Sequence, residues 1–164
     1  MDQIETILEP TGIEGAFTQQ LDILDTKGGP VLHMLRPSMA MHSHLVSMGK
    51  SIQEIYFSEV LPKAVKGWKR HHVQQQLFAV PFGRILVVLY DGRRETKSSG
   101  KVVEVVLGRP NYRLLTIPPM VWYAFAAATD TPSILCNAVD IPHNPEESDR
   151  KDLNDPGIPY RFQA

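Results

Sequence analysis

The apolar residues of this chain come in short runs, and Gly, Pro, Asn or Asp residues separate one run from the next. Short runs rich in Val, Ile, Leu, Phe and Tyr are typical of β-strands, whereas helices need longer stretches with a 3.6-residue period. The pattern predicts a mostly β protein with strands at 17–25, 31–35, 52–60, 63–70, 75–80, 84–90, 102–107, 112–117, 121–126 and 133–140.

The run Arg84–Tyr90 is almost continuously apolar, which predicts a strand buried on both faces. Asp91 and Gly92 then provide a turn, and the polar stretch 93–100 is expected to form an exposed hairpin loop. Helix signals are few. Residues 38–48 could form one or two turns, and 145–150 begin with Pro and acidic residues, as the first turn of a short helix does.

Many short strands in 164 residues favour a single domain, residues 1–164, that is all-β with few short helices. Turn-punctuated strands at this spacing are typical of a sandwich or a jelly-roll barrel. Such barrels often hold one ligand in the lumen or its mouth. The sequence therefore predicts one ligand site in the lumen or mouth of a barrel.

Composition excludes several classes of function. A net charge of −1 and a pI of about 6.6 argue against bulk electrostatic binding of nucleic acid. Every apolar run is too short to cross a membrane, so no membrane partner is expected. The single Cys136 cannot form an intrachain disulfide, and the N-terminus lacks the pattern of a signal peptide. We therefore expect a cytoplasmic protein.

One strand-like stretch carries most of the chemistry: Lys66-Gly67-Trp68-Lys69-Arg70-His71-His72. Its cations suggest an anionic ligand such as a diphosphate, and its His and Lys residues could transfer protons. Because side chains alternate along a strand, Lys69 and His71 share one face and Arg70 and His72 the other, and a shift of one residue would exchange them. A solvated basic edge strand is the alternative.

A transition-metal site is not expected. Metal-binding β-barrels of this kind use two His residues one residue apart, then a Glu, and a further His on a later strand. Here His71 and His72 are adjacent and point to opposite faces, Gln76 stands in the place of the Glu, and Tyr123 in the place of the last His. Too few good donors remain for either a structural or a catalytic metal. We therefore expect no metal and no cofactor.

Five stretches, in order, resemble the dTDP-4-dehydrorhamnose 3,5-epimerase family of RmlC-like cupins. They are 25–29 (DTKGG), 64–69 (AVKGWK), 82–85 (FGRI), 112–119 (YRLLTIPP) and 153–158 (LNDPGI). The strand ending in Pro118-Pro119 is the most specific match. The resemblance implies a metal-free cupin jelly roll that acts on nucleotide-linked 4-keto sugars. It also implies a homodimer formed by sharing an N-terminal strand, a part that residues 17–35 could play.

In that family a His removes the proton next to the ketone, an Asp near the C-terminus orients the His, and a Tyr relays a proton. This chain departs from the pattern at each of these residues. Lys69 occupies the position of the base, Tyr123 that of a second His, and the strand at 133–140 contains no Tyr. The orienting Asp has no counterpart before Ala164. The resemblance thus implies the fold and the ligand class more strongly than the standard mechanism.

The same resemblance assigns ligand contacts. Lys66 and Lys27 match Arg residues that hold the diphosphate, and Gln76 replaces a cation. Asn137 and Asp140 lie on a strand that faces the ligand, and either could bind sugar hydroxyls. Arg70 and His72 would join the substrate-binding set if their face of the strand lined the barrel.

Two assignments of the base stay open. His71 could remove the proton while Lys69 stabilises the enolate, or Lys69 could be the base if burial lowers its pKa. Tyr123 would donate a proton from the opposite wall. The predicted function is a nucleotide-sugar epimerase or isomerase of surface-carbohydrate biosynthesis. A catalytically inactive cupin that binds a sugar or nucleotide sugar is the alternative, and a metal-dependent cupin is the third.

Overall fold

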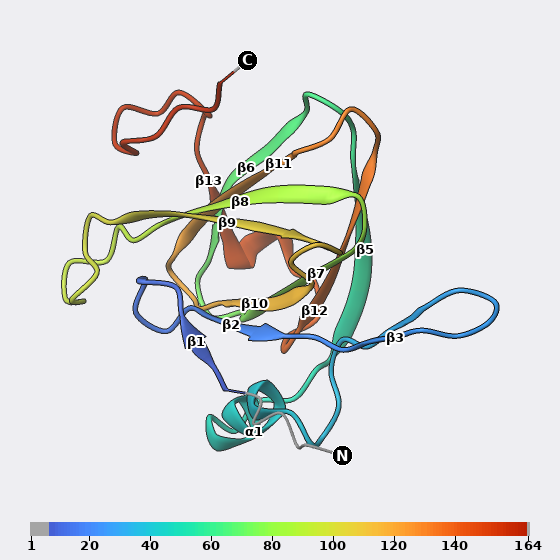
Figure 1. Cartoon of the computed structure of the whole chain (residues 1–164). Helices are drawn as coiled ribbons and strands as arrows, with labels where there is room; N and C mark the ends of the chain where they lie inside the picture. The colour runs from blue at the N-terminus through green and yellow to red at the C-terminus, as the bar shows by residue number, and fades with distance from the viewer. Residues whose placement is uncertain (1–6, 164) are drawn as a thin grey trace.

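The computed structural model describes residues 7–163, which fold into two antiparallel sheets that face each other and a small separate hairpin (Figure 1). Across the first sheet the strands run in the order β1 (Glu9–Pro10), β2 (Phe17–Gln20), β10 (Arg113–Ile117), β7 (Gln76–Phe82), β12 (Ser133–Val139) and β5 (Glu54–Val60). Across the second they run β13 (Ser148–Arg150), β6 (Val65–His71), β11 (Trp122–Ala127), β8 (Arg84–Tyr90) and β9 (Val102–Gly108).

The main core lies between the two sheets. Its members include Phe78 of β7, Val87 of β8, Leu115 of β10 and Phe125 of β11, all buried. Alternate residues of β8 pack on the other side of the second sheet, where Val88 is also fully buried. The prediction that 84–90 form a strand buried on both faces is therefore confirmed.

Each sheet is covered on its outer face. The helix α1 (Ala40–Ser47) packs Met41 and Leu45 against the first sheet, and the buried side chain of Gln19 accepts a hydrogen bond from the backbone N–H of Met41 at 2.7 Å. On the second sheet the C-terminal tail lies over Trp68, and Ile158 of the tail is fully buried there. The covered faces explain why short strands suffice to bury a large apolar surface.

Two predicted elements differ from the structure. The strand expected at 17–25 is divided, because β2 pairs with β10 whereas β3 (Ile23–Leu24) pairs with β4 (Val31–Leu32) in a hairpin. The helix expected at 145–150 is only the 3-10 turn η1 (Pro145–Glu147), and β13 follows it at once. The backbone there pairs with the free edge of β6, which a helix could not do.

The predicted loop at 93–100 is ordered by a buried carboxylate. Asp91 accepts hydrogen bonds from Arg93, Thr96 and Ser98. These donors hold the pKa of Asp91 well below its usual range, although burial alone would raise it. The β3–β4 hairpin instead projects away from the sheets, on the right in Figure 1. Within residues 7–163, no helix is long and apolar enough to cross a membrane.

Candidate active site

An irregularity in β6 decides which side chains enter the space between the sheets. Tyr123 of β11 pairs with Lys69, but Phe125, two residues on, pairs with Lys66, three residues back. The extra residue on β6 is a β-bulge at Gly67 and Trp68. Gly67 has a φ of +133°, and a Cβ there would lie 2.5 Å from the Cβ of Ala124. Only glycine fits this close approach.

Because of the bulge, Lys66 joins Lys69 on the inner face of β6. Both line a cavity of about 190 Å³. Trp68 points to the outer face, where the tail covers it. Arg70 forms an ion pair with Asp149 at 2.7 Å, and His72 Nε2 lies 3.0 Å from the same carboxylate. The face of β6 that carries Lys69 therefore lines the barrel, and the face that carries Arg70 and His72 does not.

The cavity lies between the two sheets. Three cationic, several aromatic and a few neutral polar side chains form most of its lining. The lining residues are Tyr56, Ser58, Lys66, Gly67, Lys69, Phe78, Tyr123, Phe125, Leu135, Asn137 and Arg150. This volume is below the roughly 300–1,000 Å³ typical of pockets for drug-sized ligands. It therefore suits a single ring, with any larger group outside the mouth.

Cations gather at the cavity. Lys66 and Arg150 are exposed and Lys69 is half-buried, and Arg150 is the neighbour of Lys69 across the β6–β13 pair. Burial and, next, the charge of Arg150 lower the pKa of Lys69, while Glu147 opposes the shift. Among the described residues, the lining contains no Asp or Glu. The arrangement favours a negatively charged ligand.

On the β6 and β11 side of the cavity, Glu147, His71 and Tyr123 form a chain of hydrogen bonds. His71 Nδ1 lies 2.6 Å from the Glu147 carboxylate, and His71 Nε2 lies 3.2 Å from the Tyr123 hydroxyl. His71 is only 3% exposed and does not line the cavity itself, whereas Tyr123 does. Any proton that His71 exchanges with a ligand must therefore pass through Tyr123.

The direction of these hydrogen bonds follows from Glu147. Its carboxylate also accepts from the backbone N–H groups of Val73 and Gln74, and these bonds together with His71 lower its pKa despite burial. An ionised carboxylate can only accept, so the proton of His71 lies on Nδ1. Its Nε2 is then an acceptor, and the Tyr123 hydroxyl donates to it.

The pKa shifts agree with this direction. Burial lowers the pKa of His71, against the effect of Glu147, and so favours the neutral imidazole. Burial also raises the pKa of Tyr123 far above its ordinary value, which keeps the phenol neutral. The expected resting state is a neutral His71 that accepts a hydrogen bond from a neutral phenol.

The opposite wall of the cavity comes from the first sheet. Tyr56 of β5 and Asn137 of β12 are paired across the two strands, and Asn137 Nδ2 donates to the Tyr56 hydroxyl at 2.8 Å. Asn137 also donates to Gln76 Oε1 at 2.7 Å, so Gln76 supports this wall without lining the cavity. Tyr123 lies on the wall of Lys69 and not opposite it, because β11 and β6 are adjacent strands.

Other residues predicted from the sequence lie elsewhere. Lys27 is exposed in the β3–β4 hairpin. Asp140 forms an ion pair with Lys50 at 2.7 Å and accepts from the backbone N–H of Gln75, which gives it a structural role. Arg70 and His72 are on the outer face, as described above. None of these four lines the cavity.

Sequence reasoning missed Glu147, Arg150 and Tyr56. The first two fall in the stretch that was expected to be a helix, so no strand pairing with β6 was considered. Tyr56 occurs in a predicted strand, but it alternates with the apolar Ile55 and Phe57, which are exposed in the structure, so alternation in the sequence would have turned Tyr56 outward.

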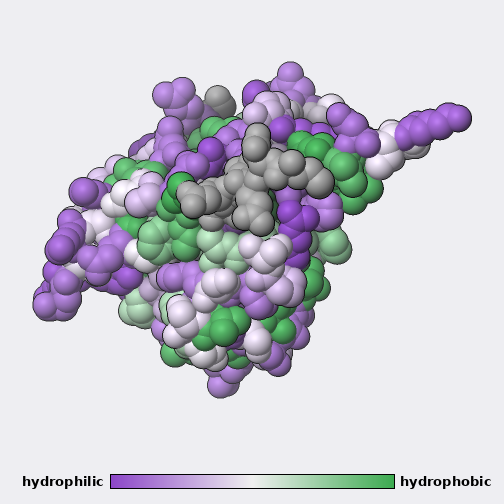
Figure 2. Space-filling model, turned by 60° about the horizontal axis from the view of Figure 1, so that its bottom comes forward, coloured by the Kyte–Doolittle hydropathy of each residue, from purple (hydrophilic) through white to green (hydrophobic). Residues whose placement is uncertain are grey.

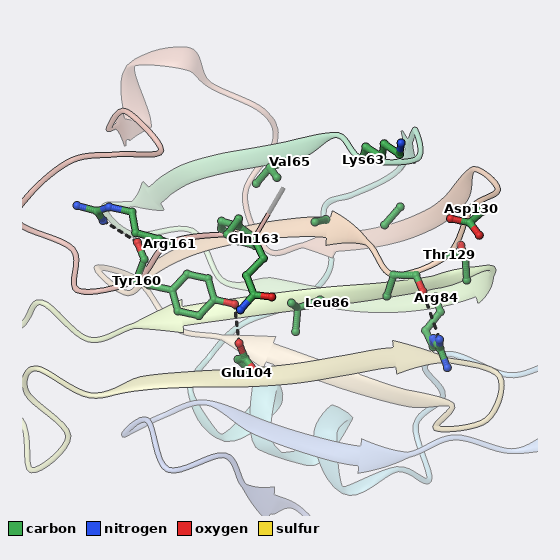
Figure 3. A pocket seen from close by; sticks show the side chains of 14 residues that line it. Lys63, Val65, Arg84, Leu86, Glu104, Thr129, Asp130, Tyr160, Arg161 and Gln163 are labelled. Atoms are coloured by element: carbon green, nitrogen blue, oxygen red, sulfur yellow. Dashed lines mark hydrogen bonds between the residues drawn. The ribbon is translucent and has the colours of Figure 1, made fainter.

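A larger hollow than this cavity lies elsewhere on the described residues. A groove of about 1010 Å³ crosses the outer face of the second sheet. Figure 3 shows Tyr160 of the tail, which donates a hydrogen bond to Glu104 at the edge of this groove. Its charged residues have both signs, with Lys63 and Asp130 at one end. It contains none of the proton-transfer residues, so the smaller inner cavity is the better candidate. Across residues 7–163, no group of three or more His, Cys, Asp or Glu side chains could hold a metal ion.

Comparison with known proteins adds sequence relatives. Over 106 residues the chain is 36% identical to a probable low-salt glycan biosynthesis epimerase of Haloferax volcanii, and over 95 residues it is 30% identical to a spore coat polysaccharide biosynthesis protein of Bacillus subtilis. These alignments cover 64% and 58% of this chain. They span 65% and 63% of the relatives' lengths, somewhat less than two thirds.

Comparison with solved structures identifies proteins of the same fold. A dTDP sugar isomerase from Desulfovibrio desulfuricans is 51% identical, with a TM-score of 0.84 over 94% of this chain and 92% of that chain. A 4-keto-6-deoxy sugar epimerase from Streptomyces spheroides has a TM-score of 0.83 at 18% identity, over 97% of this chain and 80% of that chain, and so shares the fold. The predicted RmlC-like cupin jelly roll is confirmed. The family model for dTDP-4-dehydrorhamnose 3,5-epimerase matches residues 11–163, and the chain therefore belongs to this family.

Proposed function

We propose that the protein is a nucleotide-sugar epimerase or isomerase that removes a proton next to a sugar ketone. The observation that carries this proposal is the Glu147–His71–Tyr123 chain, which ends in a cavity bordered by cations. The names of the relatives, a glycan epimerase and a dTDP sugar isomerase, support the same class of reaction. By the same analogy, the product enters surface-carbohydrate biosynthesis.

The cations define how the substrate would lie. Lys66 and Arg150 are at the exposed side of the cavity and would hold the diphosphate, and the small inner volume would hold the keto sugar. Lys66 Nζ donates to Ser58 Oγ at 2.8 Å, which keeps this ammonium at the mouth. The ammonium of Lys69, deeper on the same face, is suited to stabilise an enolate oxygen.

Tyr123 and His71 would act together as the base. The carbon next to the ketone loses its proton to the Tyr123 oxygen while the Tyr123 hydroxyl proton moves to His71 Nε2. The electron pair of the broken C–H bond forms the enolate, and Glu147 stabilises the imidazolium that results. This relay avoids a free phenolate, which the raised pKa of Tyr123 disfavours.

Proton NMR in deuterated water with dTDP-4-keto-6-deoxyglucose tests the proposal. The wild-type protein should replace the C3 or C5 proton with deuterium, and the carbon that exchanges identifies the reaction. Lys69→Met separates the two possible bases. If Lys69 only stabilises the enolate, exchange is slowed but still follows the titration of His71, moved to higher pH because the charge of Lys69 lowers the pKa of His71. If Lys69 is the base, exchange is lost at every pH. Nucleotide binding without any exchange by the wild type would favour a non-catalytic binding protein.

We also propose a homodimer formed through the β3–β4 hairpin. Figure 2 shows apolar side chains at the base of this projecting arm, where Leu24 and Val31 are exposed. Phe57 on β5 is 67% exposed, which is unusual for a large apolar side chain on a sheet. Sedimentation should give a dimer for the wild type and a monomer for Leu24→Glu. Val106→Glu, at an exposed apolar site on β9, should stay dimeric.

For the cellular location, we propose the cytoplasm. The free thiol of Cys136, buried in the barrel wall, is compatible with a reducing compartment. Fractionation of cells that produce the protein, with antibody detection, tests this location.

A further inference from the structure

A chain of oriented amide groups runs through the first sheet and ends at the cavity. Gln74 Nε2 donates to the carbonyl oxygen of Ile141, and Gln76 Nε2 donates to Gln74 Oε1 at 2.7 Å. Asn137 Nδ2 then donates to Gln76 Oε1 at 2.7 Å and to the Tyr56 hydroxyl at 2.8 Å. Because the carbonyl of Ile141 can only accept, each amide in the chain is fixed in one orientation.

A second contact fixes Asn137 independently. The backbone N–H of Leu77, which can only donate, points at Asn137 Oδ1 at 3.3 Å. The amide nitrogen of Asn137 must therefore face Tyr56, and the Tyr56 oxygen must accept. Asn137 and Gln76 are both almost fully buried, so reversal of the chain would leave several buried polar atoms unpaired.

The two phenols of the cavity therefore have opposite polarity. Tyr123 uses its proton in the bond to His71 and presents lone pairs to the cavity. Tyr56 uses a lone pair in the bond from Asn137 and keeps its proton for the cavity. They come from opposite sheets, with β11 on one side and β5 on the other. One wall is built to accept a proton and the other to donate one.

We propose that Tyr56 is the catalytic proton donor that completes inversion at the reacting carbon, with Asn137 as its positioning residue. This inference rests on the proposed function and deepens it. Once Tyr123 and His71 have taken the proton from one face, the Tyr56 O–H bond breaks and its proton joins the carbon on the other face. The enolate becomes a ketone again. His71 returns its extra proton to Tyr123, which releases a proton to water at the cavity, and the Tyr56 phenolate takes up a proton from water at the mouth, so that the protons balance and both walls are reset.

Burial raises the pKa of Tyr56, with a smaller contribution from the charge of Glu54, so the phenol holds its proton. The hydrogen bond from Asn137 lowers this pKa and thus stabilises the phenolate that donation leaves. The strand β12 has no Tyr, yet its Asn137 stands directly across from Tyr56 in the register. The phenol thus comes from the neighbouring strand, and the amide of β12 directs it.

Tyr56→Phe removes the donor and keeps the ring. In deuterated water, the variant should still exchange the substrate proton, within about fivefold of the wild-type rate, because the base wall is intact. Formation of the epimer should fall by about 10²–10⁴-fold, the usual contribution of a general acid. A parallel fall of exchange and epimer, or no fall in either, would overturn the role of Tyr56 as donor.

Asn137→Asp reverses the direction of the hydrogen bond to the Tyr56 hydroxyl, and the side chain keeps almost the same shape. A carboxylate accepts from Tyr56, so the hydroxyl proton turns away from the cavity. The ratio of epimer formed to proton exchanged should fall at least tenfold, whereas a merely structural role would lower both rates together. Saturation-transfer detection of bound dTDP shows whether each variant is folded. If the Asn137→Asp variant does not bind dTDP, the ratio measured for Tyr56→Phe alone tests the role of Tyr56 as proton donor.

Tyr160→Phe is the matched control, because this phenol lies on the outer face and donates to Glu104. Its exchange and its epimer yield should both equal those of the wild type. The two proposals fail differently. A wild type that never exchanges the proton refutes the epimerase and the donor together, whereas exchange that Tyr56→Phe slows in step with product formation refutes the donor alone.

Discussion

The two faces of β6 carry the same kinds of residue in different surroundings. His71 and His72 are neighbours in the sequence, and each contacts a carboxylate, Glu147 or Asp149. His71 is 3% exposed and its second nitrogen contacts Tyr123, whereas the side chain of His72 is 42% exposed. A carboxylate partner alone therefore does not make a histidine suitable for catalysis. Burial and a second partner at the cavity make the difference.

The lysines and the arginine of the strand show the same contrast. Lys69 lies inside with a lowered pKa, whereas Arg70 lies outside over the ring of Trp122, at 4.7 Å from its centroid. Alternation along the strand separates Lys69 from Arg70, and the bulge at Gly67 adds Lys66 to the inner side. The comparison can be tested with pairs of variants, one on each face.

The largest difference is expected between the two histidines. His71→Asn should slow deuterium exchange by about 10²–10⁴-fold, the usual contribution of a general base, because Tyr123 then has no strong acceptor. His72→Asn should change the rate by less than about twofold, since surface ion pairs contribute little. Exchange rates from NMR compare the variants directly. Equal losses in both would show that the inner face has no special role.

Gly67→Ala should destabilise the fold by about 2–5 kcal/mol, from the left-handed backbone and the clash with Ala124 together. Gly100 is the control, because it also has a positive φ but has no neighbour within 4 Å of an added Cβ. Gly100→Ala should cost only about 1–2 kcal/mol. Urea unfolding followed by circular dichroism measures both. A similar cost at the two positions would mean that the bulge tolerates a side chain.

The pH dependence of deuterium exchange tests the role of His71 as part of the base. Its pKa in the folded protein is lower than its ordinary value of 6.5, so exchange should be constant above about pH 6.5 and fall at lower pH as the imidazole is protonated. Glu147→Gln removes a group that raises this pKa. The fall should therefore move to still lower pH, while the plateau rate decreases. A shift to higher pH would contradict the assignment.

The same shift affects stability. The unfolded chain protonates His71 at a higher pH than the folded protein does, so it binds more protons between the folded pKa and about 6.5. The free energy of unfolding should therefore decrease as the pH falls through this range. In His71→Asn this part of the decrease should be absent, which urea unfolding at a series of pH values would detect.

The smallest effect is expected at Arg70. Arg70→Ala removes the ion pair with Asp149 and the contact with Trp122, and should cost at most about 1–2 kcal/mol. Deuterium exchange should not change. A large loss of exchange would mean that the outer face contributes to the reaction through β6.

Much of the fold could be predicted because the strands are marked by short apolar runs, and a run such as Arg84–Tyr90 packs as its composition indicates. The region 145–150 was predicted less well. Its Pro and acidic residues favour a helix locally, but β6 offers an unpaired edge, and the tertiary pairing prevails over local propensity.

The site was harder to predict. Alternation along a strand gives two equivalent sets of residues, and only the packing of Trp68 and Tyr123 selects between them. The bulge then breaks the alternation at Lys66, which no periodic pattern can reveal. Glu147 and Tyr56 are far from His71 in the sequence. Their roles depend on strand neighbours that become visible only in three dimensions.

The tail that covers the second sheet has a spectroscopic consequence. Trp68 and Trp122, the two tryptophans of the sequence, pack in the outer cluster with Ile158, and Trp68 contacts Tyr160 and Phe162. The aromatic residues of the cavity are Tyr and Phe instead. Intrinsic tryptophan fluorescence should therefore be blue-shifted and sensitive to release of the tail, but almost silent when a ligand enters the barrel.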